Sequence, residues 1–131
     1  MRGAGKKTMA RANEEVSASQ MPVTPAMFNV LLALVDGEKH GYAILKEVDE
    51  QTQGEVRLST GTLYGIIKRL LAEGLIAESR TRPAAAMDDP RRRYYRVTEA
   101  GREVAAAEAV RMEKLIARAR AKRLIKVFRP V

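Results

Sequence analysis

The side chains best suited to bind a ligand lie near the start of the segment "LSTGTLYGIIKRLLAEGLI", which runs from Leu58 to Ile76. The later part of this segment has the apolar spacing of a helix, whereas its first turn is rich in hydroxyls and contains a glycine, which are poor helix formers. The residues concerned are Ser59, Thr60, Gly61, Thr62 and Tyr64. Their hydroxyls can bond phosphates or base edges, and the N–H groups that begin a helix attract phosphate. Ser59 could instead act only as an N-cap, and Thr62 only as a solvated hydroxyl.

Three consecutive arginines form a second polar group. Arg91, Arg92 and Arg93 follow Asp88 and Asp89 closely in the chain. The arginines could grip phosphates or reach a minor groove, or they could pair internally with the two aspartates. Because exposed ion pairs contribute only about 0–1 kcal/mol, such pairing would not prevent contact with a nucleic acid. We favour the contact with phosphate.

Four aromatic side chains have roles that the sequence leaves open. Tyr64 could contact phosphate or pack between helices, and we favour the first. Tyr94 and Tyr95 are neighbours in a strand-like segment, so one is expected to face the core and the other the outside. His40 is expected to be a structural cap or a hydrogen-bond partner rather than a pH switch.

The composition excludes several classes of site. The chain has 131 residues, no cysteine and one histidine, so disulfides and thiolate metal sites are excluded and no metal is expected. It contains no glycine-rich phosphate loop and no paired acids in a pocket-like context, so we expect neither an enzyme nor a cofactor. No apolar run approaches the roughly 18 residues of a membrane span. A cytoplasmic protein that does not cross a membrane is expected.

The positive charge is concentrated in the last third of the chain. The formal net charge is +8, to which residues 1–21 contribute +2, residues 22–90 contribute −3 and residues 91–131 contribute +9. This distribution favours a polyanionic partner, either a nucleic acid or an anionic membrane surface. A solvated helix face rich in arginine is the alternative.

The spacing of apolar and capping residues predicts four helices and a hairpin. Thr24 followed by Pro25 is typical of a helix start, as is Thr98 followed by Glu99. The helices are predicted at about 24–36, 40–53, 59–73 and from 99 onward, with the hairpin at 75–97. The last helix is expected to bend, end or change its packing partner near 121–124. The predicted apolar faces follow this spacing. They are Phe28, Leu31, Leu32 and Val35 in the first helix, Tyr42, Leu45 and Val48 or Asp49 in the second, and Leu63, Ile66, Ile67, Leu70 and Leu71 in the third.

This order of elements is typical of a winged helix-turn-helix domain, a mainly α (α+β) fold. In such domains the third helix enters the DNA major groove and the hairpin is the wing. The chain then divides into a disordered tail at 1–21, a DNA-binding domain at 22–98 and a C-terminal helix at 99–131.

Three blocks resemble the PadR family of transcriptional regulators. They are "HGYAI" at 40–44, "STGTLYGIIKRLLAEGLI" at 59–76 and "RRRYYRVTEAGR" at 91–102. The resemblance implies a dimeric, ligand-responsive repressor of the short form, with one C-terminal dimerisation helix. The residues expected to contact DNA are Tyr42, Ser59, Thr60, Gly61, Thr62, Tyr64, Lys68, Arg91, Arg92 and Arg93. The family often has a proline at the position of Gly65 and an acid near Leu71 or Ala72, so the preferred DNA sequence is expected to differ.

The last helix carries an apolar stripe that is too long for this small domain to cover. The stripe includes Val104, Met112, Leu115, Ile116 and Ala119, and we expect it to pack against a second copy of the chain. A two-fold dimer would present two recognition helices about 34 Å apart to a palindromic operator. A small-molecule effector is possible by resemblance, although the absence of tryptophan does not support a flat stacking site.

Two functions of other classes compete with a DNA-binding repressor. The mildly acidic segment 22–90 is compatible with a winged-helix module that binds protein and no specific DNA. A membrane-surface helix at the C-terminus is less favoured, because its apolar face is mostly alanine.

Overall fold

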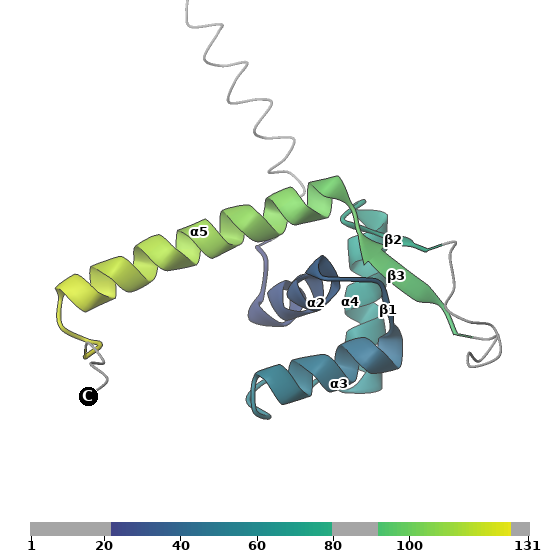
Figure 1. The fold of residues 1–131 in the computed structure, drawn as a ribbon, viewed down its shortest axis with the longest axis horizontal. Helices are drawn as coiled ribbons and strands as arrows, with labels where there is room; N and C mark the ends of the chain where they lie inside the picture. The colour runs from purple at the N-terminus through teal and green to yellow at the C-terminus, as the bar shows by residue number, and fades with distance from the viewer. Residues whose placement is uncertain (1–21, 80–91, 127–131) are drawn as a thin grey trace, which may run out of the picture.

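The structure is a computed structural model, and it describes residues 22–79 and 92–126 (Figure 1). Its elements are α2 (Pro25–Val35), β1 (Lys39–His40), α3 (Gly41–Gln51), α4 (Thr60–Ala72), β2 (Ile76–Glu78), β3 (Tyr94–Val97) and α5 (Glu99–Ala121). This mostly helical arrangement with a small antiparallel sheet is a winged helix fold, as predicted. The predicted tail at 1–21 and the middle of the hairpin lie outside the described residues.

The predicted helix starts are confirmed by their caps. The hydroxyl of Thr24 accepts a hydrogen bond from the Met27 N–H at 3.1 Å. Ser59 and Thr98 cap α4 and α5 in the same way. Each hydroxyl satisfies an N–H group that the first turn of a helix leaves without an internal partner.

Helix α4 ends where Gly74 adopts a φ of +75°. The Gly74 N–H donates to the Leu71 carbonyl at 3.1 Å, and the Leu75 N–H donates to the Leu70 carbonyl at 2.9 Å. This pair of bonds requires a left-handed residue, which glycine adopts without steric penalty. The turn sends Leu75 and Ile76 straight from the helix into the core.

The sheet has three antiparallel strands in the order β1–β3–β2. His40 lies opposite Tyr94 in one ladder, and Glu78 lies opposite Tyr95 in the other. Strand β1 was not predicted, because a strand of two residues is too short to show an alternating pattern.

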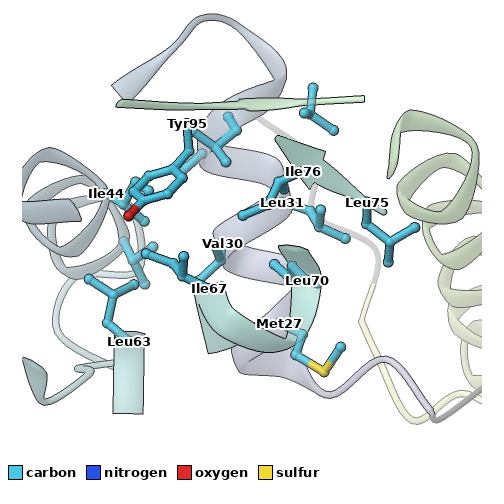
Figure 2. Packing of buried hydrophobic residues seen from close by; sticks show 14 of the residues in the cluster. Met27, Val30, Leu31, Ile44, Leu63, Ile67, Leu70, Leu75, Ile76 and Tyr95 are labelled. Atoms are coloured by element: carbon cyan, nitrogen blue, oxygen red, sulfur yellow. The ribbon is translucent and has the colours of Figure 1, made fainter. Parts of the chain in front are cut away.

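The core lies between α2, α3, α4 and the sheet, whose apolar side chains point into a common interior (Figure 2). The largest fully buried side chains are Val30, Leu31, Leu34, Ile44, Leu63, Leu70 and Ile76. The predicted apolar face of α3 was partly wrong: Val48 is buried and Leu45 packs against the core, but Tyr42 is 62% exposed and Ile44 is buried in its place. Helix α3 begins directly after β1 with a buried Gly41, and this start sets which face of the helix turns inward.

Helix α5 is attached to the body of the domain through its first turns. A Cβ at Gly101 would collide with the Leu75 carbonyl oxygen and lie 2.7 Å from Val97 Cγ2, so only glycine allows this close approach. Ala105 is buried, and Val104 packs against the core. Beyond these turns the helix extends away from the rest of the domain (Figure 1). Within the described ranges, no helix is both long and apolar enough to cross a membrane.

Candidate nucleic-acid interface

The polar start of α4 is exposed, and its apolar residues hold it to the core. Leu63, Ile67 and Leu70 are buried on one side of the helix. The exposed residues include every position of α4 and its cap that we predicted to contact DNA: Ser59, Thr60, Gly61, Thr62, Tyr64 and Lys68. The core therefore fixes this helix while its hydroxyl-rich turn faces solvent.

Ser59 and Thr62 are linked to each other at the start of α4. The Ser59 hydroxyl accepts from the Thr62 N–H at 3.1 Å and lies 3.0 Å from the Thr62 hydroxyl. The capping role of Ser59 is thus confirmed. The Thr62 hydroxyl accepts from Ser59 and keeps its own proton available for donation to a ligand.

A groove with an aromatic and basic lining adjoins this turn. It has a volume of about 530 Å³ and lies where the start of α3, the middle of α4 and strand β3 meet. Its lining residues are His40, Gly41, Tyr42, Tyr64, Arg92, Arg93 and Tyr95. Tyr64 belongs both to the groove and to the exposed face of α4, so the two surfaces are continuous.

Tyr64 packs against the first residue of α3. A Cβ on Gly41 would collide with the Tyr64 hydroxyl and lie 2.7 Å from its Cζ atom. Glycine at position 41 therefore allows the ring to lie across the helix start. Because the side chain is also 45% exposed, Tyr64 packs between helices and still presents its ring to the groove.

His40 is a structural cap, as predicted. Its Nδ1 accepts from the Ala43 N–H at 3.2 Å, so the proton of a neutral ring resides on Nε2 while the cap is formed. Arg92 Nη1 lies 3.2 Å from Nε2, and a neutral imidazole with its single acceptor cannot bond both groups. The ring also stacks beside Tyr42 and meets the edge of Tyr94. This packing connects the start of α3 to the wing.

Arg92 and Arg93, the described members of the arginine triplet, differ in their partners. Arg93 Nη1 donates to Glu78 Oε2 at 2.9 Å, and this bond, together with the charge of the carboxylate, raises the pKa of Arg93. The sequence analysis did not foresee this cross-strand pair. Both arginines are exposed, and Arg92 lies beside His40. Arg91, Asp88 and Asp89 lie outside the described residues.

The prediction that one of the two strand tyrosines faces outward was wrong. Tyr94 is 9% exposed and Tyr95 is 5% exposed. Tyr95 joins the core, where burial, followed by the neighbouring charges of Tyr64 and Glu78, raises the pKa of its hydroxyl. Tyr94 lies on the other face of β3, opposite His40 in the adjacent strand. A central strand can be covered on both faces, which alternation in the sequence does not reveal.

The residues predicted for dimerisation fall into two groups. Val104 packs against the chain's own core, and Met112 and Ala119 are partly buried. Leu115 and Ile116 are 48% and 43% exposed on the part of α5 that extends outward. The helix ends at Ala121, as predicted.

A second apolar surface, which the sequence analysis assigned to the core, lies between α2 and α5. Leu32 is 50% exposed there. It lines an open groove of about 320 Å³ together with Phe28, Val35, Arg102, Ala105, Ala106 and Ala109. Arg102 bridges the two helices by donating to the Val35 carbonyl at 2.8 Å. Exposed apolar groups thus occur on both helices.

The family profile described as "Transcriptional regulator PadR-like family" matches residues 30–107, which include most of the core, α4, β3 and the start of α5. The chain belongs to this family. This match confirms the resemblance to the PadR family that the sequence indicated. Because members of the family are transcriptional regulators, the prediction that this protein is not an enzyme is also confirmed. In the part of the chain that the structure describes, no three His, Asp or Glu side chains are grouped as metal ligands would be.

Individual relatives extend this PadR-family assignment. The transcriptional regulator Rv3488 of Mycobacterium tuberculosis is 32% identical over 87 residues, covering 66% of this chain and 75% of that protein. An uncharacterized 37.1 kDa protein in transposon TN4556 of Streptomyces fradiae is 41% identical over 98 residues. The matched region covers 75% of this chain but only 26% of that larger protein.

Solved structures share the fold. A PadR-like transcriptional regulator from Bacillus cereus has a TM-score of 0.63 at 19% identity, covering 77% of this chain and 93% of that one. The PadR protein of Bacillus subtilis, solved in complex with operator DNA, has a TM-score of 0.58 at 21% identity. The similarity covers 68% of this chain and 49% of the Bacillus subtilis chain.

Proposed function

We propose that this PadR-family regulator is a dimeric repressor that binds double-stranded DNA at a palindromic operator. One observation carries the proposal: the exposed, hydroxyl-rich start of α4 is continuous with a groove that contains Arg92 and Arg93. Hydroxyls, arginines and helix N-termini are the groups with which proteins hold phosphate and sugar. The structural similarity to a PadR protein bound to operator DNA supports the same use of this surface.

The two parts of this surface have different tasks in the proposal. Helix α4 enters the major groove, where Thr60 and Thr62 can reach base edges or phosphates. The groove beside it holds the sugar–phosphate backbone through Tyr42, Tyr64 and the wing arginines. Base contacts would then specify the sequence, and backbone contacts would position the protein.

The exposed apolar groups of α5 and α2 support dimerisation. Leu115 and Ile116 are exposed on the outer part of α5. Leu32 lines the apolar groove between α2 and α5. We propose that a second copy covers these groups and that the two copies are related by a two-fold axis, which a palindromic operator would match. The resemblance to ligand-responsive regulators extends the proposal to a small-molecule effector that would release the operator.

A gel shift with the region upstream of the protein's own gene tests the function. At about 150 mM salt and in excess competitor DNA, we expect a discrete complex, because specific contacts survive where charge alone does not. Binding that competitor abolishes would indicate only nonspecific charge. If the folded dimer also selected no sequence from fragments of the genome, the protein would be better described as a winged-helix module that binds another protein.

A further inference from the structure

Apart from Lys68, the side of α4 opposite the core carries almost no side-chain atoms. Gly61, Gly65, Lys68 and Ala72 recur there at helical spacing, and all four are exposed. They lie two positions from the buried residues Leu63, Ile67 and Leu70, which places them on the opposite face of the helix. We call these four residues the crest of α4.

The fold itself does not require the two glycines of the crest. A Cβ at Gly61 or Gly65 would meet nothing within 4 Å. Neither glycine has a positive φ, unlike Gly74 at the end of the helix. Glycine within a helix lowers its stability relative to alanine. Two glycines are therefore present where alanine would fit the domain better, which indicates that something outside the domain needs the space.

Lys68 is the long side chain that remains on the crest. The adjacent cation of the same helix is already engaged, because Arg69 pairs with Glu73 at 3.1 Å. The structure gives Lys68 no hydrogen bond or ion pair with any described residue. Its ammonium group can therefore bind a ligand without first leaving a partner.

We propose that the bare crest lets the backbone of α4 lie deep in the major groove, and that Lys68 reads a guanine there. This inference rests on the proposed DNA-binding function and assigns its specificity. A crest residue points toward the floor of the groove, whereas residues on the flanks of the helix, such as Tyr64, point toward the phosphates. Guanine presents two acceptors, O6 and N7, on the major-groove edge, and an ammonium group offers only donors. Adenine places a donor beside its N7 and suits lysine less well.

Selection of binding sites from random double-stranded DNA tests the role of Lys68. The full-length protein should select a guanine in each half-site, preferred over the other bases by about ten- to a hundredfold. Lys68→Ala should lose this preference and keep the remaining positions, whereas Lys68→Arg should retain it, because arginine also bonds O6 and N7. A Lys68→Ala consensus identical to that of the wild type would overturn this inference alone. A wild-type selection without any consensus would overturn the proposed function as well.

A second variant tests the approach of the backbone. Gly65→Ala should raise the Tm by a few degrees, because alanine favours the helix and has room there. The same change should weaken binding to the selected site about tenfold or more, because the methyl group would separate the helix from the bases. An unchanged affinity would show that the crest does not approach DNA. A lower Tm would show that the domain itself needs this glycine, which would remove the reason for the inference.

Discussion

Helix α4 and the outer part of α5 are both exposed, but they expose different groups. Helix α4 presents hydroxyls, glycines and a lysine, and its opposite face is fully buried. The outer part of α5 exposes Leu115 and Ile116 and extends beyond the turns that hold its base (Figure 1). A rigidly held polar face suits a polar partner that is bound and released. Exposed apolar groups on a projecting helix suit a partner that keeps them from water.

The largest effect is expected on the outer part of α5, where we propose that a second copy of the chain binds. Replacing Leu115 and Ile116 together by aspartate should give a monomer, because two charges cannot be buried without partners. Operator affinity should then fall by about 10²- to 10⁴-fold, because the second half-site contact is no longer intramolecular. Analytical ultracentrifugation and a binding titration would measure both effects.

Ala117→Asp provides the matched control for this experiment. Ala117 is exposed on the other side of the same turns of α5, so this variant should remain a dimer. A Leu115→Asp, Ile116→Asp protein that stays dimeric would show that the exposed apolar residues of α5 do not form the interface.

The next effect concerns the point where α5 joins the domain. Gly101→Ala should lower the free energy of unfolding by about 1–3 kcal/mol or more, because the new methyl group collides with the Leu75 backbone. Urea denaturation would measure it. Gly65→Ala is the matched control, since the same substitution meets open space there. Equal effects at both positions would mean that α5 does not pack closely at Gly101.

A smaller effect separates the two parts of the DNA-binding surface. Arg92→Ala should weaken binding to all sequences about equally and reduce the slope of log K against log salt by about one, because it removes one phosphate contact. Thr62→Ala should instead change the preference among sequences. Titrations at several salt concentrations with matched and mutated operators would distinguish these results. If the two variants behaved alike, the division between groove and helix would be wrong.

The smallest effect concerns Tyr95, a core residue that also lines the aromatic and basic groove beside α4. Burial raises the pKa of Tyr95 above its ordinary value of 10.0, so the folded protein binds the phenolic proton more tightly than the unfolded chain does. Stability should therefore fall as the pH rises through the unfolded and then the folded pKa, beginning near 10. Urea midpoints measured at pH 8 and above pH 10 should show a smaller decrease for Tyr95→Phe than for the wild type. Tyr42→Phe, which changes an exposed ring, should behave like the wild type.

The sequence by itself determined the parts of this protein that depend on near neighbours. Thr24, Ser59 and Thr98 each cap a helix through an N–H three residues ahead, so a short stretch of sequence is enough to predict them. The apolar spacing of α4 and its polar first turn also lie within one segment. Together with the family motifs, they predicted the fold class and the polar residues that face solvent on α4. Leu71, which was predicted on the apolar face, is 37% exposed.

Only the tertiary structure decided how distant segments meet. Gly41 must be glycine because Tyr64, 23 positions later, lies across it. Arg93 pairs with Glu78, and Tyr94 is buried opposite His40, because β3 lies between the other two strands. Leu32 looked like a core residue but borders a groove that exists only where α5 crosses α2. Spacing along the chain shows which face of an element is apolar, whereas burial and pairing depend on the surface that each face meets in space.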